Sequence, residues 1–65
     1  MDGATLEDEL LTVDQVASIL QLHADTIRRY IREKKLRVIR IASNSVRIRR
    51  SELERFIRER EEPGP

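Results

Sequence analysis

Residues 10–33, LLTVDQVASILQLHADTIRRYIRE, contain the clearest structural pattern in this 65-residue chain. Thr12 followed by Gln15 fits a capping box, in which two side chains satisfy free backbone N–H groups at the start of a helix. Leu11 and Val16 occupy the two positions of a hydrophobic staple around that start. We therefore predict a helix of about eight residues directly after Thr12. Its buried face is expected to contain Val16, Ala17, Ile19 and Leu20.

A second helix is predicted after a short break. Residues 21–23 interrupt the first pattern, and Leu22 is expected to turn into the core. Within residues 24–33, Ile27 and Ile31 are four apart and define a buried stripe. Two short helices joined by about three residues, the second basic on its free face, predict a helix-turn-helix. That free face carries Asp25, Arg29 and Arg32.

Beyond Lys35 the pattern changes from helical to extended. Residues 36–41 are rich in β-branched side chains, and residues 46–49 alternate strictly between apolar and basic ones. The loop between them, residues 42–45, contains Asn44, a residue type that tolerates the left-handed backbone of a tight turn. We therefore predict a two-stranded hairpin with one packed face and one positive face.

A third helix is predicted near the C-terminus. Ser51 and Glu54 fit a second capping box at its start. A buried stripe at the i, i+3, i+4 spacing follows, made up of Leu53, Phe56 and Ile57. Ion pairs four residues apart are expected on its surface, Glu54 with Arg58 and Arg55 with Glu59.

The predicted fold is α+β and mainly helical. It consists of a helix-turn-helix, a two-stranded antiparallel wing and a C-terminal helix, which together describe a winged helix-turn-helix over residues 10–60. Residues 1–9 are polar and acidic and are predicted to form a flexible tail. Residues 61–65 are predicted to be a C-terminal tail, because the final Pro-Gly-Pro cannot continue a helix.

Charge is strongly segregated along the chain. The formal net charge of +1 combines −6 over residues 1–25, +9 over residues 26–50 and −2 over residues 51–65. A concentrated positive block beside acidic segments is typical of a surface that binds a polyanion, and phosphate backbones are common polyanions. The charge pattern therefore favours a protein that binds nucleic acid.

Composition argues against several other classes. The chain has no cysteine and only one histidine, His23, so we expect no disulfide, metal or cofactor. Apolar runs never exceed two residues, whereas a membrane span needs about twenty, and the acidic N-terminus does not fit a signal peptide. A chain this short leaves no room for an enclosed active site. We expect a soluble, cytoplasmic protein that is not an enzyme.

Taken together, the segments resemble the excisionase-type branch of the MerR superfamily of winged helix-turn-helix domains. The resemblance covers about residues 10–58. It rests on four segments that fall at the family's spacing: LLTVDQVASIL, DTIRRYIREKKL, VIRI and VRIRRSELERFI. The chain departs from the family at three turn positions. Gln21 and Ala42 stand where glycine is usual, and His23 stands where serine is usual.

The resemblance implies binding to double-stranded DNA. The second helix would enter the major groove, and the wing would lie along the neighbouring minor groove or its phosphates. The implied contact residues of the second helix are Asp25, Thr26, Arg28, Arg29, Tyr30 and Arg32. Those of the wing are Arg40, Asn44, Arg47 and Arg49.

The biological role implied is that of an accessory excision factor, which directs site-specific recombination, or of a small transcriptional regulator. A recombinase or RNA polymerase would then be a protein partner, with cooperative self-association on DNA. A bacterial, phage or mobile-element origin and a place on the nucleoid would follow. The small size of the chain favours an accessory role, because no effector domain is expected beyond Arg60.

Other interpretations stay open. The chain could be the N-terminal DNA-reading segment of a larger transposase or regulator, or a module that binds another protein through its charges. The arginines of the second helix could be a solvated face, and those of the wing could prevent edge-to-edge pairing. Lys34 and Lys35 could complement the helix dipole. Tyr30 could pack at the core boundary or contact a phosphate.

Overall fold

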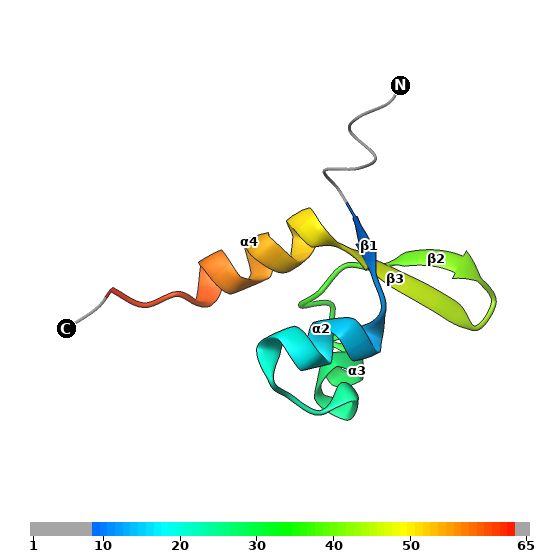
Figure 1. The fold of residues 1–65 in the computed structure, drawn as a ribbon, viewed down its shortest axis with the longest axis horizontal. Helices are drawn as coiled ribbons and strands as arrows, with labels where there is room; N and C mark the ends of the chain where they lie inside the picture. The colour runs from blue at the N-terminus through cyan, green and yellow to red at the C-terminus, as the bar shows by residue number, and fades with distance from the viewer. Residues whose placement is uncertain (1–8, 64–65) are drawn as a thin grey trace, which may run out of the picture.

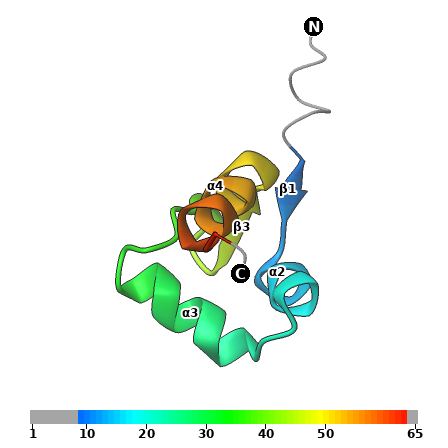
Figure 2. The same ribbon diagram turned by 90° about the vertical axis from the view of Figure 1, so that its left-hand side faces the viewer.

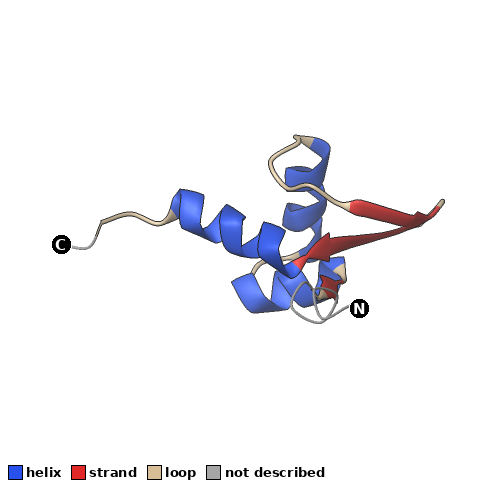
Figure 3. Cartoon of the chain, turned by 90° about the horizontal axis from the view of Figure 1, so that it is seen from above, coloured by secondary structure: helices blue, strands red, loops and turns tan. Residues whose placement is uncertain are grey.

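The computed structural model describes residues 9–63 and contains three helices and three strands (Figure 1). In chain order they are β1 (Leu10–Leu11), α2 (Val13–Leu20), α3 (Ala24–Arg32), β2 (Ile39–Ala42), β3 (Ser45–Arg49) and α4 (Arg50–Arg60). The predicted winged helix-turn-helix is confirmed. The hairpin and α4 extend in opposite directions, with α2 and α3 between them (Figure 3). Residues 1–8 and 64–65 of the predicted tails lie outside the described part.

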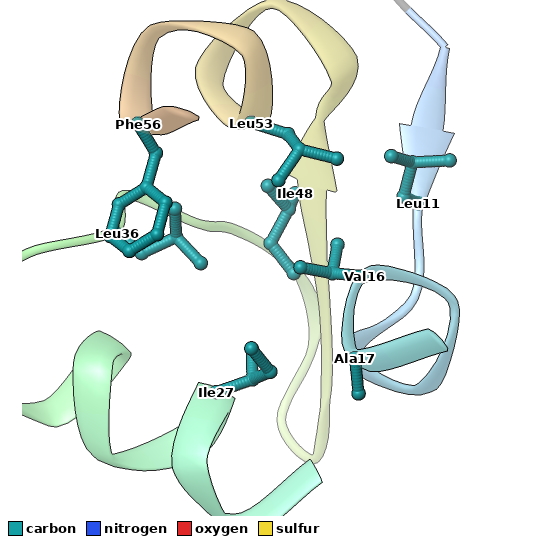
Figure 4. Close-up of a cluster of buried hydrophobic side chains, with 8 residues drawn as sticks. All are labelled: Leu11, Val16, Ala17, Ile27, Leu36, Ile48, Leu53 and Phe56. Atoms are coloured by element: carbon teal, nitrogen blue, oxygen red, sulfur yellow. The ribbon is translucent and has the colours of Figure 1, made fainter. Parts of the chain in front are cut away.

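One hydrophobic core holds the helices on the sheet (Figure 4). Ile27 of α3 and Ile48 of β3 are fully buried, as are Val16 and Leu36. Because Ile27 fixes the inward side of α3, it also fixes which side of this helix faces solvent. Figure 2 shows α3 lying across the molecule, with α4 seen end-on above it. The core consists of Leu11, Val16, Ala17, Ile27, Leu36, Ile48, Leu53 and Phe56.

The sheet has three strands in the order β1-β3-β2, one more than predicted. Leu10 and Leu11 lie opposite Arg49 and Ile48 in an antiparallel pair, so β3 is the central strand. A two-residue strand carries no alternation for a sequence pattern to detect. It forms because the edge of β3 offers unpaired backbone groups. The backbone oxygen of Glu9 extends the pairing by accepting a hydrogen bond from the Arg50 N–H at 2.8 Å.

The hairpin is shorter and tighter than predicted. Its first strand begins at Ile39 instead of residue 36, and the turn contains only Ser43 and Asn44. The prediction of a left-handed Asn44 is wrong, because this residue is not among those with positive φ. The pairing register shifts by one residue between Arg40 and Ala42. Such a bulge increases the local twist, which allows the strands to close without a left-handed residue in the turn.

The start of α2 agrees with the prediction, whereas part of its buried face does not. The Gln15 N–H donates to Thr12 Oγ1 at 3.0 Å and the Thr12 N–H donates to Gln15 Oε1 at 2.9 Å, which completes the capping box. The prediction that Ile19 is buried is wrong, since it is 54% exposed. Val16 and Ala17 make the buried contacts, and Ile19 lies beyond the edge of that face. Leu22, predicted to enter the core, is 42% exposed.

Two non-glycine residues in left-handed conformations bound α3 at either end. Gln21 has φ 58° and Lys34 has φ 66°. After α2, the Leu22 N–H donates to the Ala17 carbonyl at 2.9 Å, and after α3 the Lys35 N–H donates to the Tyr30 carbonyl at 2.9 Å. These six-to-one bonds define Schellman motifs, whose left-handed position is usually glycine.

Replacing Gln21 with glycine is expected to raise the free energy of unfolding by about 0.5–1 kcal/mol. A left-handed residue with a Cβ costs about 1–2 kcal/mol, which glycine avoids, although the greater freedom of glycine in the unfolded chain offsets part of the gain. Chemical denaturation measures the change. Gln21→Ala keeps the Cβ and is the control. Equal stability of the two variants would show that this turn carries no strain.

The start of α4 differs from the prediction. The helix begins at Arg50, and its N-cap is Arg49, without a side-chain capping bond, so the predicted capping box of Ser51 and Glu54 is wrong. The reason is that β3 runs directly into α4, and the Glu9 carbonyl already accepts a hydrogen bond from the first N–H of the helix.

The buried face and the ion pairs of α4 agree with the prediction in part. Leu53 and Phe56 are buried as predicted, while Ile57 is 39% exposed. The predicted pair of Arg55 with Glu59 is present at 2.7 Å. Glu54 lies 3.5 Å from Arg50, on the preceding turn, and not against its predicted partner.

Candidate nucleic-acid interface

The solvent-facing side of α3 is basic. Ile27 is fully buried, and positions 28, 29 and 32 therefore lie on exposed parts of the helix surface at one hundred degrees per residue. Asp25 is also exposed, and Thr26 is half-buried beside this surface. The outer surface of α3 thus presents Asp25, Arg28, Arg29 and Arg32 to solvent, with Thr26 at its margin.

An ion pair joins two of these residues in the first half of α3. Arg28 Nη1 donates to Asp25 Oδ1 at 3.2 Å across one helical turn. The Asp25 side chain is 96% exposed, so this carboxylate projects almost fully into solvent. An exposed pair of this kind contributes little to stability, about 0–1 kcal/mol. It does present a hydrogen-bond acceptor and a multi-donor guanidinium side by side.

Tyr30 packs at the boundary between α3 and α4. Its ring centroid lies 5.3 Å from that of Phe56 at an interplanar angle of 46°. Three cations surround the same ring: Arg29 at 5.5 Å, Lys35 at 5.9 Å and Arg60 at 5.6 Å from its centroid. Tyr30 therefore packs as a boundary residue, and it brings cations from three segments to one place. A phosphate contact by its hydroxyl stays a prediction.

The register of the hairpin divides the wing arginines between its two faces. Arg40 lies opposite Val46, and Ile39 lies opposite Arg47. Opposed residues of an antiparallel pair share a face, so Arg40 and Arg47 lie on opposite faces. Arg47 Nη1 donates to the Val46 carbonyl at 2.9 Å, which folds this side chain along its own strand.

The remaining wing positions follow from the same register. Arg49 is two residues beyond Arg47 and therefore shares its face. Asn44 is exposed at the tip of the hairpin. The alternating sequence indicates that the wing is basic. It does not indicate that Arg40 lies on the opposite face of the hairpin from Arg47 and Arg49.

A groove connects α3 to the face of the wing that carries Arg40. Its apolar lining comes from Ile31, Leu36 and Val38. The cations along it are Arg32, Lys34, Arg37 and Arg40. Lys34 and Arg37 belong to the linker between α3 and β2, and neither was predicted to be a site residue. The basic block in the sequence contains both of them, but only the path of the linker brings them beside Arg32 and Arg40.

Glu52 of α4 fixes the path of that linker. Its Oε2 accepts a hydrogen bond from the Arg37 N–H at 3.0 Å, and its carboxylate also accepts bonds from the Arg55 guanidinium. The Glu52 side chain is 11% exposed. The Arg55 hydrogen bond, aided by the bond from the Arg37 backbone, lowers the pKa of Glu52 below its usual 4.5, although burial acts in the opposite direction. Glu52 is thus a positioning residue for the basic groove.

Neither a metal centre nor a membrane span emerges from the described residues. Across residues 9–63, His, Asp and Glu side chains do not gather in threes around a point that could hold a metal ion. Within the same range, each helix is too short and too polar to cross a bilayer.

The fold and its basic surfaces define a winged helix-turn-helix of the DNA-binding class. Residues 10–61 match the family model described as a helix-turn-helix domain, and the chain belongs to this family. A comparison with curated proteins gives no match. The family supports DNA binding through the helix-turn-helix.

Proposed function

We propose that this protein binds double-stranded DNA sequence-specifically, with α3 in the major groove and the wing on the adjacent minor groove or backbone. The observation that carries the proposal is the continuity of positive charge from the outer surface of α3, through the linker groove, to Arg40. An α-helix fits the major groove of B-DNA, where each base pair presents a distinct pattern of donors and acceptors.

The first half of α3 is the part we assign to base recognition. Arginine makes bidentate hydrogen bonds to guanine, and aspartate accepts a hydrogen bond from the cytosine amino group. The adjacent Arg28 and Asp25 supply both chemistries from one helical turn. Thr26 and Arg29 complete the set of proposed base-recognition residues, and Arg32 approaches the DNA backbone. This division is a proposal about roles and rests on helix position and charge.

The backbone contacts we propose come from the linker groove and the wing. Arg32, Lys34, Arg37 and Arg40 would neutralise the phosphates of one strand beside α3. Arg47 and Arg49, on the other face of the wing, would contact a neighbouring stretch, with Asn44 at the tip. An arginine near a narrow minor groove gains from the enhanced negative potential there.

The biological role we propose is that of an accessory DNA-binding factor of the excisionase type or a small transcriptional regulator. The resemblance of residues 10–58 to excisionase-like domains supports it. A recombinase or RNA polymerase would be the protein partner, with cooperative binding of several copies to DNA of bacterial, phage or mobile-element origin. Nuclease footprinting distinguishes the two roles. Protection within a recombination attachment site supports the first, and protection within a promoter supports the second.

Replacing Arg28 and Arg29 with alanine is expected to weaken DNA binding and to flatten its salt dependence. If six phosphates are contacted, log K should fall against log salt with a slope of about −5. A mixed-sequence duplex lacks the specific site, so Arg28 and Arg29 would meet phosphates there in place of their bases, and losing both should reduce the slope by about 2. Fluorescence anisotropy with a labelled mixed-sequence duplex across a salt series measures it.

A charge-matched control comes from Arg50 and Arg58. Replacing both with alanine removes the same charge without altering α3 or the groove, and the slope should change by less than half as much. If the unmodified protein fails to bind duplex DNA at low salt, the proposal is wrong. Binding to a protein partner through charge alone would then be the better explanation.

A further inference from the structure

A second cluster of cations lies on the α4 side of α3. Arg60 stacks on Phe56, with its guanidinium carbon 4.0 Å from the ring centroid, and lies 5.6 Å from the Tyr30 centroid. Lys35 and Arg29 complete the cluster, within 6 Å of the Tyr30 ring. The four cation–ring contacts of this cluster all lie outside the groove that leads to the wing. The cluster joins the outer surface of α3, through Arg29, to the C-terminal turn of α4, through Arg60.

The cluster has an excess of positive charge. Glu33 pairs with Lys35 at 3.2 Å and offsets one of its three cations. Glu52 and Glu59 of α4, which line the same hollow as Lys35 and Arg60, both bind Arg55. Cations held on the faces of aromatic rings are attracted to the ring quadrupole and remain able to bind an anion on their outer side. The Tyr30–Phe56 pair therefore gathers cations that have affinity for an anionic group.

The cluster and the groove toward the wing lie on different flanks of α3, and Lys34 and Arg37 of the linker border both. Tyr30 and Ile31 are neighbours in sequence and therefore point about one hundred degrees apart around the helix. Ile31 lines the groove toward the wing, whereas Tyr30 contacts α4. Figures 1 and 3 agree with this, because α4 and the hairpin extend to opposite sides of the molecule. A helix in the major groove has a phosphate backbone on each side of it, and the groove is about 12 Å wide.

We propose that Arg60 and Lys35 form a second contact with the DNA backbone, on the strand that faces away from the wing. Tyr30 and Phe56 act as positioning residues that hold the Arg60 guanidinium toward that strand. The C-terminal turn of α4 is then part of the DNA interface as well as the support of the core. This inference rests on the proposed function, and it lengthens the stretch of duplex that a single copy covers.

The test compares two arginines on α4 in the same anisotropy salt series. Arg60→Gln removes a cation of the cluster. Arg58→Gln removes the same charge from the opposite face of α4, since position 58 is two residues from Phe56. We expect the slope of log K against log salt to become shallower by about 0.9 for Arg60→Gln, the value for one phosphate. For Arg58→Gln, the change in slope relative to wild type should be less than about half of that value.

A third variant separates binding from stability. Arg60→Lys keeps the positive charge while losing the planar stacking, and it should retain most of the wild-type slope. Thermal unfolding of all three variants identifies any general loss of structure. Equal slopes for wild type and Arg60→Gln, with DNA binding intact, would overturn the second contact alone. Loss of salt-dependent binding in the wild-type protein would instead overturn the proposed function.

Discussion

Replacing Ile27 with alanine is expected to lower the free energy of unfolding by about 3–4 kcal/mol. The side chain is fully buried between α3 and the rest of the core, and removing large aliphatic groups from such sites costs about 2–5 kcal/mol. The whole stability of a domain of this size is roughly 3–10 kcal/mol. The change is therefore comparable with the total, and urea denaturation followed by circular dichroism should show a much earlier transition.

Ile19→Ala is the matched control for this experiment. It removes the same atoms from the neighbouring helix, but Ile19 is 54% exposed. Its effect should stay below about 1 kcal/mol, because little apolar area leaves water at that position on folding. Similar losses for the two variants would contradict the assignment of Ile27 to the core.

Replacing Glu52 with alanine is expected to lower the free energy of unfolding by about 1–2 kcal/mol. The change removes the acceptor of the Arg37 N–H and the partner of Arg55, and hydrogen bonds to charged groups contribute about 1.5–3 kcal/mol when well shielded. The Arg37 backbone is exposed, which places the expected loss toward the lower end. Because the linker carries Lys34 and Arg37, DNA affinity should fall as well.

The contribution of Glu52 should depend on pH with a definite sign. Its pKa is lowered in the folded state, so the folded protein favours the ionised carboxylate more than the unfolded chain does. The stabilisation is therefore fully present above about pH 5. It is lost as the pH falls below 4.5 and through the lowered pKa. Thermal unfolding of wild type and Glu52→Gln between pH 3 and 7 should show their difference shrinking toward acid.

Glu54→Ala controls for the loss of a carboxylate on the same helix. Glu54 lies 3.5 Å from Arg50 in an exposed pair, and such pairs contribute about 0–1 kcal/mol. A Glu52→Ala variant no less stable than Glu54→Ala would show that the linker does not depend on Glu52.

The helices could be predicted from the sequence because their signals are local. The capping box of Thr12 and Gln15 needs only residues three apart, and the stripe of Ile27 and Ile31 needs only residues four apart. The basic side of α3 follows from the same periodicity. These features are set within one or two helical turns, so the chain itself contains the information.

The features that could not be predicted depend on which segments meet in space. β1 exists because Leu11 pairs with Ile48, thirty-seven residues away. The fully buried Leu36 looked like the start of a strand, since its hydrophobicity fits either role. The predicted cap at Ser51 failed because Glu9 meets Arg50 across the sheet. Each error concerns a contact between distant parts of the sequence.

In the candidate interface, too, local features could be predicted and features set by distant contacts could not. That Arg28, Arg29 and Arg32 are exposed could be predicted from their spacing. The opposite faces of Arg40 and Arg47 could not, because they depend on a pairing register that a one-residue shift alters. The packing of the linker and α4 against α3 brings three further cations into the basic surfaces: Lys34, Arg37 and Arg60.

The two left-handed turns at the ends of α3 have a consequence for recognition. Gln21 and Lys34 stand where glycine would make the chain pliable, so α3 has no glycine hinge at either end. A helix held in this way is preorganised, and under the proposed function it would lose little conformational entropy on binding DNA. It also adapts poorly to a misaligned groove. If α3 enters the major groove as proposed, the two turns favour discrimination between DNA sites of slightly different shape.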